Sequence, residues 1–159
     1  MILRPGNQIQ PARSGCVGHQ HDLLADVLAE EKRGQSHWRQ GHTLFPNYGF
    51  TPAAYWVKLM LVNQSATEQW VLQFNYPLMD QIELYLPDGQ GQYRQQLAGD
   101  SYPFSRRQIK DRGFAFALQL ARGQPTTIYL RLQSRDSMII PIRVLTQERL
   151  RDIQRQEGF

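Results

Sequence analysis

Hydrophobic and polar residues alternate with a period of two along most of the chain after residue 54. The pattern is clearest in QWVLQFNY (69–76), QIELYL (81–86), GFAFALQL (113–120), TTIYLRLQS (126–134) and MIIPIRVL (138–145). A period of two is typical of strands that bury one face, and turn signals such as Pro87-Asp88-Gly89 separate the runs. The pattern therefore predicts an all-β fold, an antiparallel β-sandwich or jelly roll.

The remaining residues divide the chain into three parts. Residues 1–20 show little periodicity, and we expect a flexible lead-in. HDLLADVLAEEKRG (21–34) has apolar residues at helical spacing and predicts a short amphipathic helix, with Asp22 as N-cap and Gly34 as the stop. We expect the sandwich domain to span residues 21–146 and residues 147–159 to form a linker or short helix. Pro141 indicates an edge strand or a bulge.

Composition excludes several classes of protein. The 159 residues suit one domain, with 41% hydrophobic and 20% charged residues. The net charge of +4 comes mostly from scattered arginines, which argues against nucleic-acid binding. A single cysteine, Cys16, rules out an intrachain disulfide or a cysteine-rich zinc site. No run approaches the roughly 18 apolar residues of a membrane helix, so we expect a soluble chain.

The chemistry of a catalytic site is not apparent in the sequence. The chain has no nucleophile elbow, zinc-protease, P-loop or dinucleotide-binding motif. All four histidines precede the strand-rich region: His19, His21, His37 and His42. We expect surface histidines, no metal or cofactor, and no enzymatic activity.

A candidate binding surface follows from the strand faces that oppose the apolar rows. If the strands pair with these faces together, they form a concave surface bearing Trp56, Lys58, Tyr85, Tyr129 and Arg131. Aromatic rings stack on the C–H faces of sugars, while Lys and Arg donate hydrogen bonds to hydroxyls or carboxylates. The alternative is an ordinary outer sandwich surface, with Tyr and Arg packed across the strands.

The order of several motifs resembles a known family. GFTPAAYWVKLMLVN, PLMDQIELYL, AGDSYPFSRR, TIYLRLQS and IIPIRVL together resemble the second type of extracellular sensor domain of bacterial seven-transmembrane receptors with diverse intracellular signalling modules. The resemblance covers about residues 23–146. It implies a jelly roll similar to carbohydrate-binding modules, displayed in the periplasm ahead of seven membrane helices and a cytoplasmic output module. Such a domain is expected to sense a ligand.

The resemblance also implies which positions bind that ligand. They are Trp56 with Lys58, Asp100 with Arg107, and Tyr129 with Arg131. The family pattern more often has Arg at position 58, and Lys keeps the charge but lacks the bidentate fork of a guanidinium.

We therefore expect a ligand-sensing extracytoplasmic domain that binds a carbohydrate or a small organic anion. Its other partners would be the membrane region and the output module of the parent receptor, with a homodimer as a further possibility. Two alternatives remain open. One is a protein-interaction or dimerisation module, and the other is a carbohydrate-binding module of a secreted glycosidase.

Overall fold

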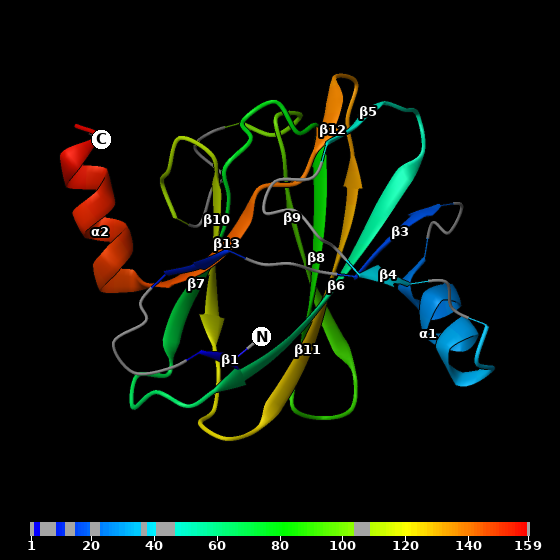
Figure 1. Cartoon of the computed structure of the whole chain (residues 1–159), viewed down its shortest axis with the longest axis horizontal. Coiled ribbons are helices and arrows are strands. Elements are labelled where there is room, and N and C mark those ends of the chain that lie inside the picture. The colour runs from blue at the N-terminus through cyan, green and yellow to red at the C-terminus, as the bar shows by residue number, and fades with distance from the viewer. Residues whose placement is uncertain are drawn as a thin grey trace.

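The computed structural model describes residues 2–3, 9–11, 15–19, 23–35, 38–40, 47–103 and 109–158. Two sheets lie face to face, and a short helix flanks the sandwich on each side: α1 (Leu24–Lys32) and α2 (Gln147–Gln156) (Figure 1). The predicted all-β sandwich is thus confirmed.

The larger sheet has the strand order β4-β3-β6-β11-β8-β9, and β1 pairs in parallel with β6. All other pairs in this sheet are antiparallel. Its strands are β1 (Ile2–Leu3), β3 (Gly15–His19), β4 (Arg39–Gln40), β6 (Ala54–Asn63), β8 (Gln81–Pro87), β9 (Tyr93–Ala98) and β11 (Pro125–Gln133).

The smaller sheet has the order β10-β7-β13-β2, and a separate two-stranded sheet pairs β12 with β5. Their strands are β2 (Ile9–Pro11), β5 (Asn47–Phe50), β7 (Gln69–Phe74), β10 (Phe114–Gln119), β12 (Ser137–Ile139) and β13 (Ile142–Thr146).

The core lies between the two sheets and consists of the apolar rows that the sequence predicts. The larger sheet contributes alternate residues of β6, β8 and β11, and the smaller sheet those of β7, β10 and β13. Each fully buried aliphatic or aromatic side chain stabilises the fold by about 1.5–3 kcal/mol. The inward residues include Val57, Leu59, Leu61, Trp70, Leu72, Phe74, Ile82, Leu84, Phe114, Phe116, Ile128, Leu130 and Leu132.

Three features differ from the expectation or were missed. The short strands β1, β2 and β3 come from residues 1–20, so the paired strands extend into the stretch that was expected to be a lead-in. Pro141 lies in neither an edge strand nor a bulge: it separates β12 from β13, and its carbonyl accepts a hydrogen bond from the Asn75 N–H. Strand β9 was missed because its polar sequence, YRQQLA, has no clear apolar row.

The helices cover the outer faces of the sandwich. Val27 of α1 packs with aromatic residues of the larger sheet, and Leu150 of α2 packs on β7, β10 and β13. The hydroxyl of Thr146 caps α2 by accepting from the Arg149 N–H. The N-cap of α1 is Leu23, which makes no side-chain capping bond, instead of the predicted Asp22, which lies outside the described residues.

Candidate functional site

Strand register brings five of the predicted site residues onto one outer face. On the central strand β11, Tyr129 lies opposite both Lys58 of β6 and Tyr85 of β8. Two positions along, Arg131 lies opposite Trp56 on one side and Glu83 on the other. We call these five predicted residues the aromatic-cationic face: Trp56, Lys58, Tyr85, Tyr129 and Arg131.

The rings of this face are covered by α1, whereas the sequence led us to expect an open surface. Trp56 is 1% exposed, Tyr129 is 2% exposed and Tyr85 is 8% exposed. Trp56 stacks on Tyr85 with 5.8 Å between ring centroids and 20° between planes. Val27 of α1 belongs to the same buried cluster, which Trp38 and Tyr93 border. The face is therefore the floor of a small second core.

A carboxylate from α1 lies among the polar groups of the face. Tyr129 donates its hydroxyl hydrogen bond to Glu31, with Oε1 at 2.9 Å and Oε2 at 3.1 Å. Lys58 Nζ lies 3.1 Å from Glu31 Oε2, and Trp38 Nε1 donates to Oε1 at 3.3 Å. We call Lys58, Tyr129 and Trp38 the carboxylate cage. An ammonium, a phenol and an indole N–H thus hold one carboxylate.

The electrostatics of the cage follow from this geometry. Burial raises the pKa of Tyr129 well above its usual value, and the negative Glu31 raises it further. A Tyr129 phenolate would have no proton to donate to the Glu31 carboxylate and would be repelled by its charge. Lys58 Nζ also lies 5.8 Å from the ring centroids of Trp38 and of Tyr129, within cation–π range. The cage thus favours a neutral phenol and a bound anion.

Arg131 lies at the other end of the face, with its side chain only 9% exposed. Its Nη1 is 3.3 Å from Glu83 Oε2, and it also donates to Gln133 Oε1 at 3.3 Å. Tyr85 beside it accepts a hydrogen bond from Gln95 Nε2 at 3.0 Å, and burial raises the pKa of Tyr85. The guanidinium of Arg131 is thus already bound by side chains of its own sheet.

One of the two remaining predicted residues, Asp100, is not brought to this face. Asp100 is exposed in the turn that follows β9, where its N–H donates to the Met79 carbonyl at 2.7 Å. Arg107 lies outside the described residues.

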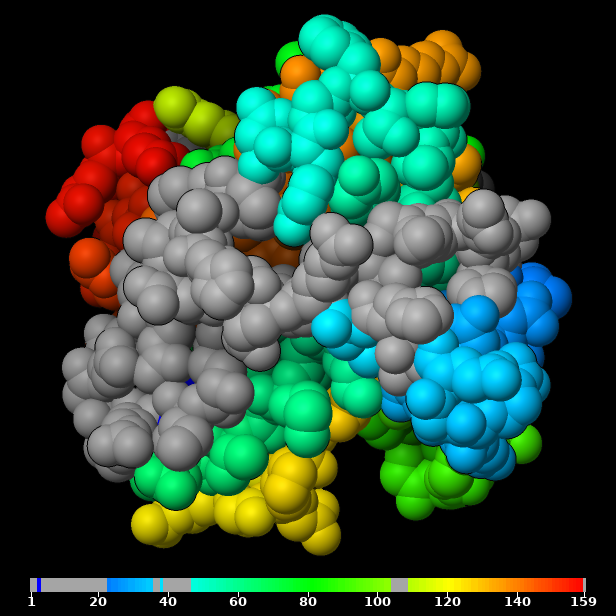
Figure 2. Space-filling model, turned by 45° about the vertical axis from the view of Figure 1, so that its right-hand side comes forward, coloured from blue at the N-terminus to red at the C-terminus, as the bar shows by residue number. Residues whose placement is uncertain are grey.

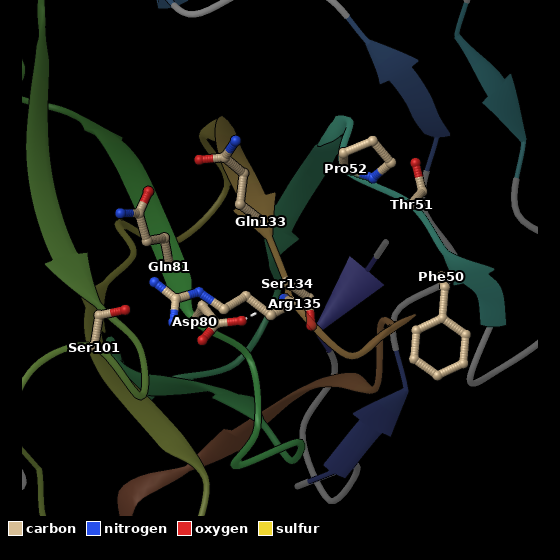
Figure 3. Close-up of a pocket in the computed structure, with 9 residues that line it drawn as sticks. All are labelled: Phe50, Thr51, Pro52, Asp80, Gln81, Ser101, Gln133, Ser134 and Arg135. Atoms are coloured by element: carbon tan, nitrogen blue, oxygen red, sulfur yellow. Dashed lines mark hydrogen bonds between the residues drawn. The ribbon is translucent and has the colours of Figure 1, made fainter.

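An open pocket of about 580 Å³ lies where the aromatic-cationic face ends (Figure 3). Gln133 connects the two, because it lines the pocket and also accepts the hydrogen bond from Arg131. The pocket is lined by Phe50, Thr51, Pro52, Asp80, Gln81, Ser101, Gln133, Ser134 and Arg135.

Sequence reasoning missed Glu31, Trp38 and the pocket. Glu31 lies 98 positions before Tyr129, and the helical pattern of α1 carries no signal for which polar residue meets the sheet. The pocket is built from strand ends and turns that have no common motif. Within the part of the chain that the structure describes, no three His, Cys, Asp or Glu residues gather in a way that could hold a metal ion.

The fold and the covered face define a two-sheet β-sandwich with a helix packed on the outer side of its larger sheet. A family model, 7TMR-DISM extracellular 2, matches residues 21–146, which is most of the chain. The chain belongs to this family, as the strand motifs predicted. A comparison of the chain with curated protein sequences found no match.

Family membership makes the chain a sensor-type extracellular domain of a membrane receptor, which places it on the periplasmic side. Among the described residues, neither helix has the length and apolar character needed to cross a bilayer.

Proposed function

We propose that this domain senses a small organic anion, and that a carboxylate of the ligand binds the carboxylate cage in the place that Glu31 holds. Binding would release α1 from the larger sheet. The ligand thereby changes the outer surface of the domain, which is the change a receptor can transmit.

The observation that carries this proposal is the set of donors around Glu31. The ammonium of Lys58, the hydroxyl of Tyr129 and the indole N–H of Trp38 converge on one carboxylate within 3.3 Å. Hydrogen bonds to ionised groups are roughly twice as strong as those between neutral groups. A site that binds the carboxylate of Glu31 has the chemistry to bind the carboxylate of a ligand.

An anion suits this face better than a sugar. A sugar needs the free face of an aromatic ring, whereas Trp56 and Tyr85 stack on each other and are at most 8% exposed. Tyr129 and Tyr93 pack in a T-shaped arrangement, with ring centroids 5.6 Å apart. These rings form a rigid apolar floor, and the polar groups above them provide the recognition.

Helix α1 is suited to moving away from the face. It has nine residues, fewer than the roughly 12 needed for an isolated helix to be even marginally stable in water. Its N-cap makes no side-chain hydrogen bond. Because Glu31 is tethered, it competes with a ligand at an effective concentration in about the millimolar range. A natural ligand must therefore make contacts beyond one carboxylate.

Calorimetric titration with acetate, succinate, citrate, glucose and maltose tests the proposal. Citrate or succinate should bind the wild-type chain and expose the α1 amides to hydrogen exchange. Lys58→Met should abolish this binding, while Lys32→Met, which changes an exposed lysine on α1, is the matched control. Glu31→Ala removes the competing carboxylate and should tighten binding at least tenfold.

Two outcomes contradict the proposal. If carboxylates bind the Glu31→Ala variant but not the wild-type chain, Glu31 is a permanent structural partner of Lys58. No carboxylate binding to either protein, together with a mass in solution that rises with concentration, would favour the interaction or dimerisation module.

A further inference from the structure

The open pocket beside the face is a second, independent candidate site. It is formed by the start of β8, the end of β11 and the turns that follow β5 and β9 (Figure 3). Its volume of about 580 Å³ lies within the range of about 300–1,000 Å³ that is usual for small-molecule sites. None of the three cage residues lines it.

Close backbone packing fixes the shape of the pocket. Gly99, which directly follows β9, has a φ of +132°, and a Cβ at this position would meet the Asp80 carbonyl oxygen at 2.1 Å. The Asp100 and Ser101 N–H groups then donate to the Met79 and Asp80 carbonyls. These contacts hold Ser101 against the start of β8.

Two opposite charges face this pocket. Asp80 contributes a carboxylate from one wall, and Arg135 contributes a guanidinium from the turn after β11. The backbone N–H of Arg135 donates to Asp80 Oδ2. Neither side chain forms an ion pair with another residue in the described ranges. The pocket therefore presents one positive and one negative group, whose formal charges cancel.

The rest of the lining adds neutral hydrogen-bonding groups and an apolar wall. Gln81 and Gln133 bring two carboxamides, and Ser101 adds a hydroxyl. On the opposite side lie Pro52 and Phe50, and Phe50 is 80% exposed (Figure 3). A ring this exposed contributes little to the core and is available to a ligand.

We infer that this pocket binds a zwitterion of the α-amino-acid type. The carboxylate of the ligand pairs with the Arg135 guanidinium, which can donate two parallel hydrogen bonds. Its ammonium pairs with Asp80, and its side chain packs against Phe50 and Pro52. The inference goes beyond the organic anion proposed for the cage.

Electrostatics favour a zwitterion over the other classes of ligand. A simple anion would be attracted by Arg135 but repelled by Asp80. A simple cation would be attracted by Asp80 but repelled by Arg135. A neutral sugar would leave two charges partly desolvated without opposite charges to compensate them. A zwitterion compensates both.

Thermal-shift and calorimetric titration of the whole chain with each of the twenty protein L-amino acids tests the inference. At least one amino acid should raise the midpoint of thermal unfolding. The C-terminal amide of that amino acid lacks the carboxylate, and its N-acetyl derivative lacks the ammonium. Each should bind at least tenfold more weakly.

Variants then locate the site. Arg135→Gln and Asp80→Asn should each weaken binding at least tenfold, and in Asp80→Asn the side-chain amide oxygen can still accept from the Arg135 N–H. Arg94→Gln changes an exposed arginine on β9 and is the matched control for charge. Phe50→Ala, at a residue outside the core, should weaken binding without lowering stability.

The outcomes separate this site from the cage. Amino-acid binding that survives Arg135→Gln and is lost in Lys58→Met would place the ligand in the cage and overturn the inference. Binding of glucose or maltose in the pocket, with no amino acid bound, would overturn the zwitterion class. No binding by any amino acid would overturn the site itself.

Discussion

Glu31 Oε2 lies 3.1 Å from Lys58 Nζ, although the two residues, one on a helix and the other on a strand, are 27 positions apart in the sequence. Their side chains are 21% and 23% exposed, so water screens the pair only in part. With the Tyr129 hydroxyl on the same carboxylate, this pair joins the C-terminal half of α1 to the larger sheet. In Figure 2, α1 (light blue) stands beside the green β8–β9 region.

Removing the charge of Glu31 should loosen α1 without unfolding the domain. In Glu31→Gln, Lys58 loses its ion pair while the amide can still accept from Tyr129. We expect a loss of about 1 kcal/mol in the free energy of unfolding. Relative to wild type, amide hydrogen exchange in this variant should become faster in α1 than in β11. Glu68→Gln, at an exposed loop residue, is the control, and equal exchange of α1 in both variants would contradict this role.

The Tyr129 hydroxyl should make the domain sensitive to alkali. Its pKa is raised in the folded state above the ordinary value of 10.0, so the folded chain holds this proton more tightly than the unfolded chain. The resulting stability is complete below pH 10 and is lost as the pH rises above it. Wild type should lose about 1.4 kcal/mol more per pH unit than Tyr129→Phe in this range. Urea unfolding from pH 8 to 11 measures the difference, and parallel curves would contradict it.

Trp56 should matter more for stability than for ligand recognition. Truncation in Trp56→Ala leaves a cavity beneath α1 beside Tyr85 and should cost about 3–5 kcal/mol. Leu97→Ala, at a side chain that is 52% exposed, should change stability by less than about 0.5 kcal/mol. Denaturant unfolding at pH 7 measures both. A stable Trp56→Ala variant that loses only ligand binding would restore Trp56 as a direct ligand contact.

A buried carboxylate should anchor α2 in a similar way on the opposite side of the molecule. Asp111 is 2% exposed and accepts from Gln73 Nε2 and Gln154 Nε2, both at 3.0 Å, and from the Gly113 N–H at 3.2 Å. Asp111→Ala removes the acceptor of these donors, of which Gln73 is buried, and should cost about 2–4 kcal/mol.

The control for Asp111 is Asp152→Asn, which breaks an ion pair with Arg155 on the exposed side of α2. It should cost less than about 0.5 kcal/mol, because surface pairs contribute little. Denaturant unfolding compares the two variants. Similar losses in both would show that Asp111 contributes no more than a surface charge.

The sequence predicted the strands with an apolar row much better than those without one. Val57, Leu59 and Leu61 form an apolar row at every second position because one face of β6 is buried in the sandwich, and this period can be recognised within a single strand. Strand β9 has no such row and was missed. The paired strands within residues 1–20 were missed for the same reason, since pairing there follows from backbone hydrogen bonds to β6 and β13.

For the candidate site, the face can be predicted from the sequence alone, whereas the helix that covers it follows from the packing of distant segments. Alternation alone places Lys58 and Tyr129 on the outward side of their strands, because successive side chains point to opposite faces of a sheet. That Glu31 lies over both residues, and that strand ends enclose Asp80 with Arg135, depends on how distant segments pack. Local periodicity does not predict those contacts, because each of them joins residues that are far apart in the sequence and meet only in the folded chain.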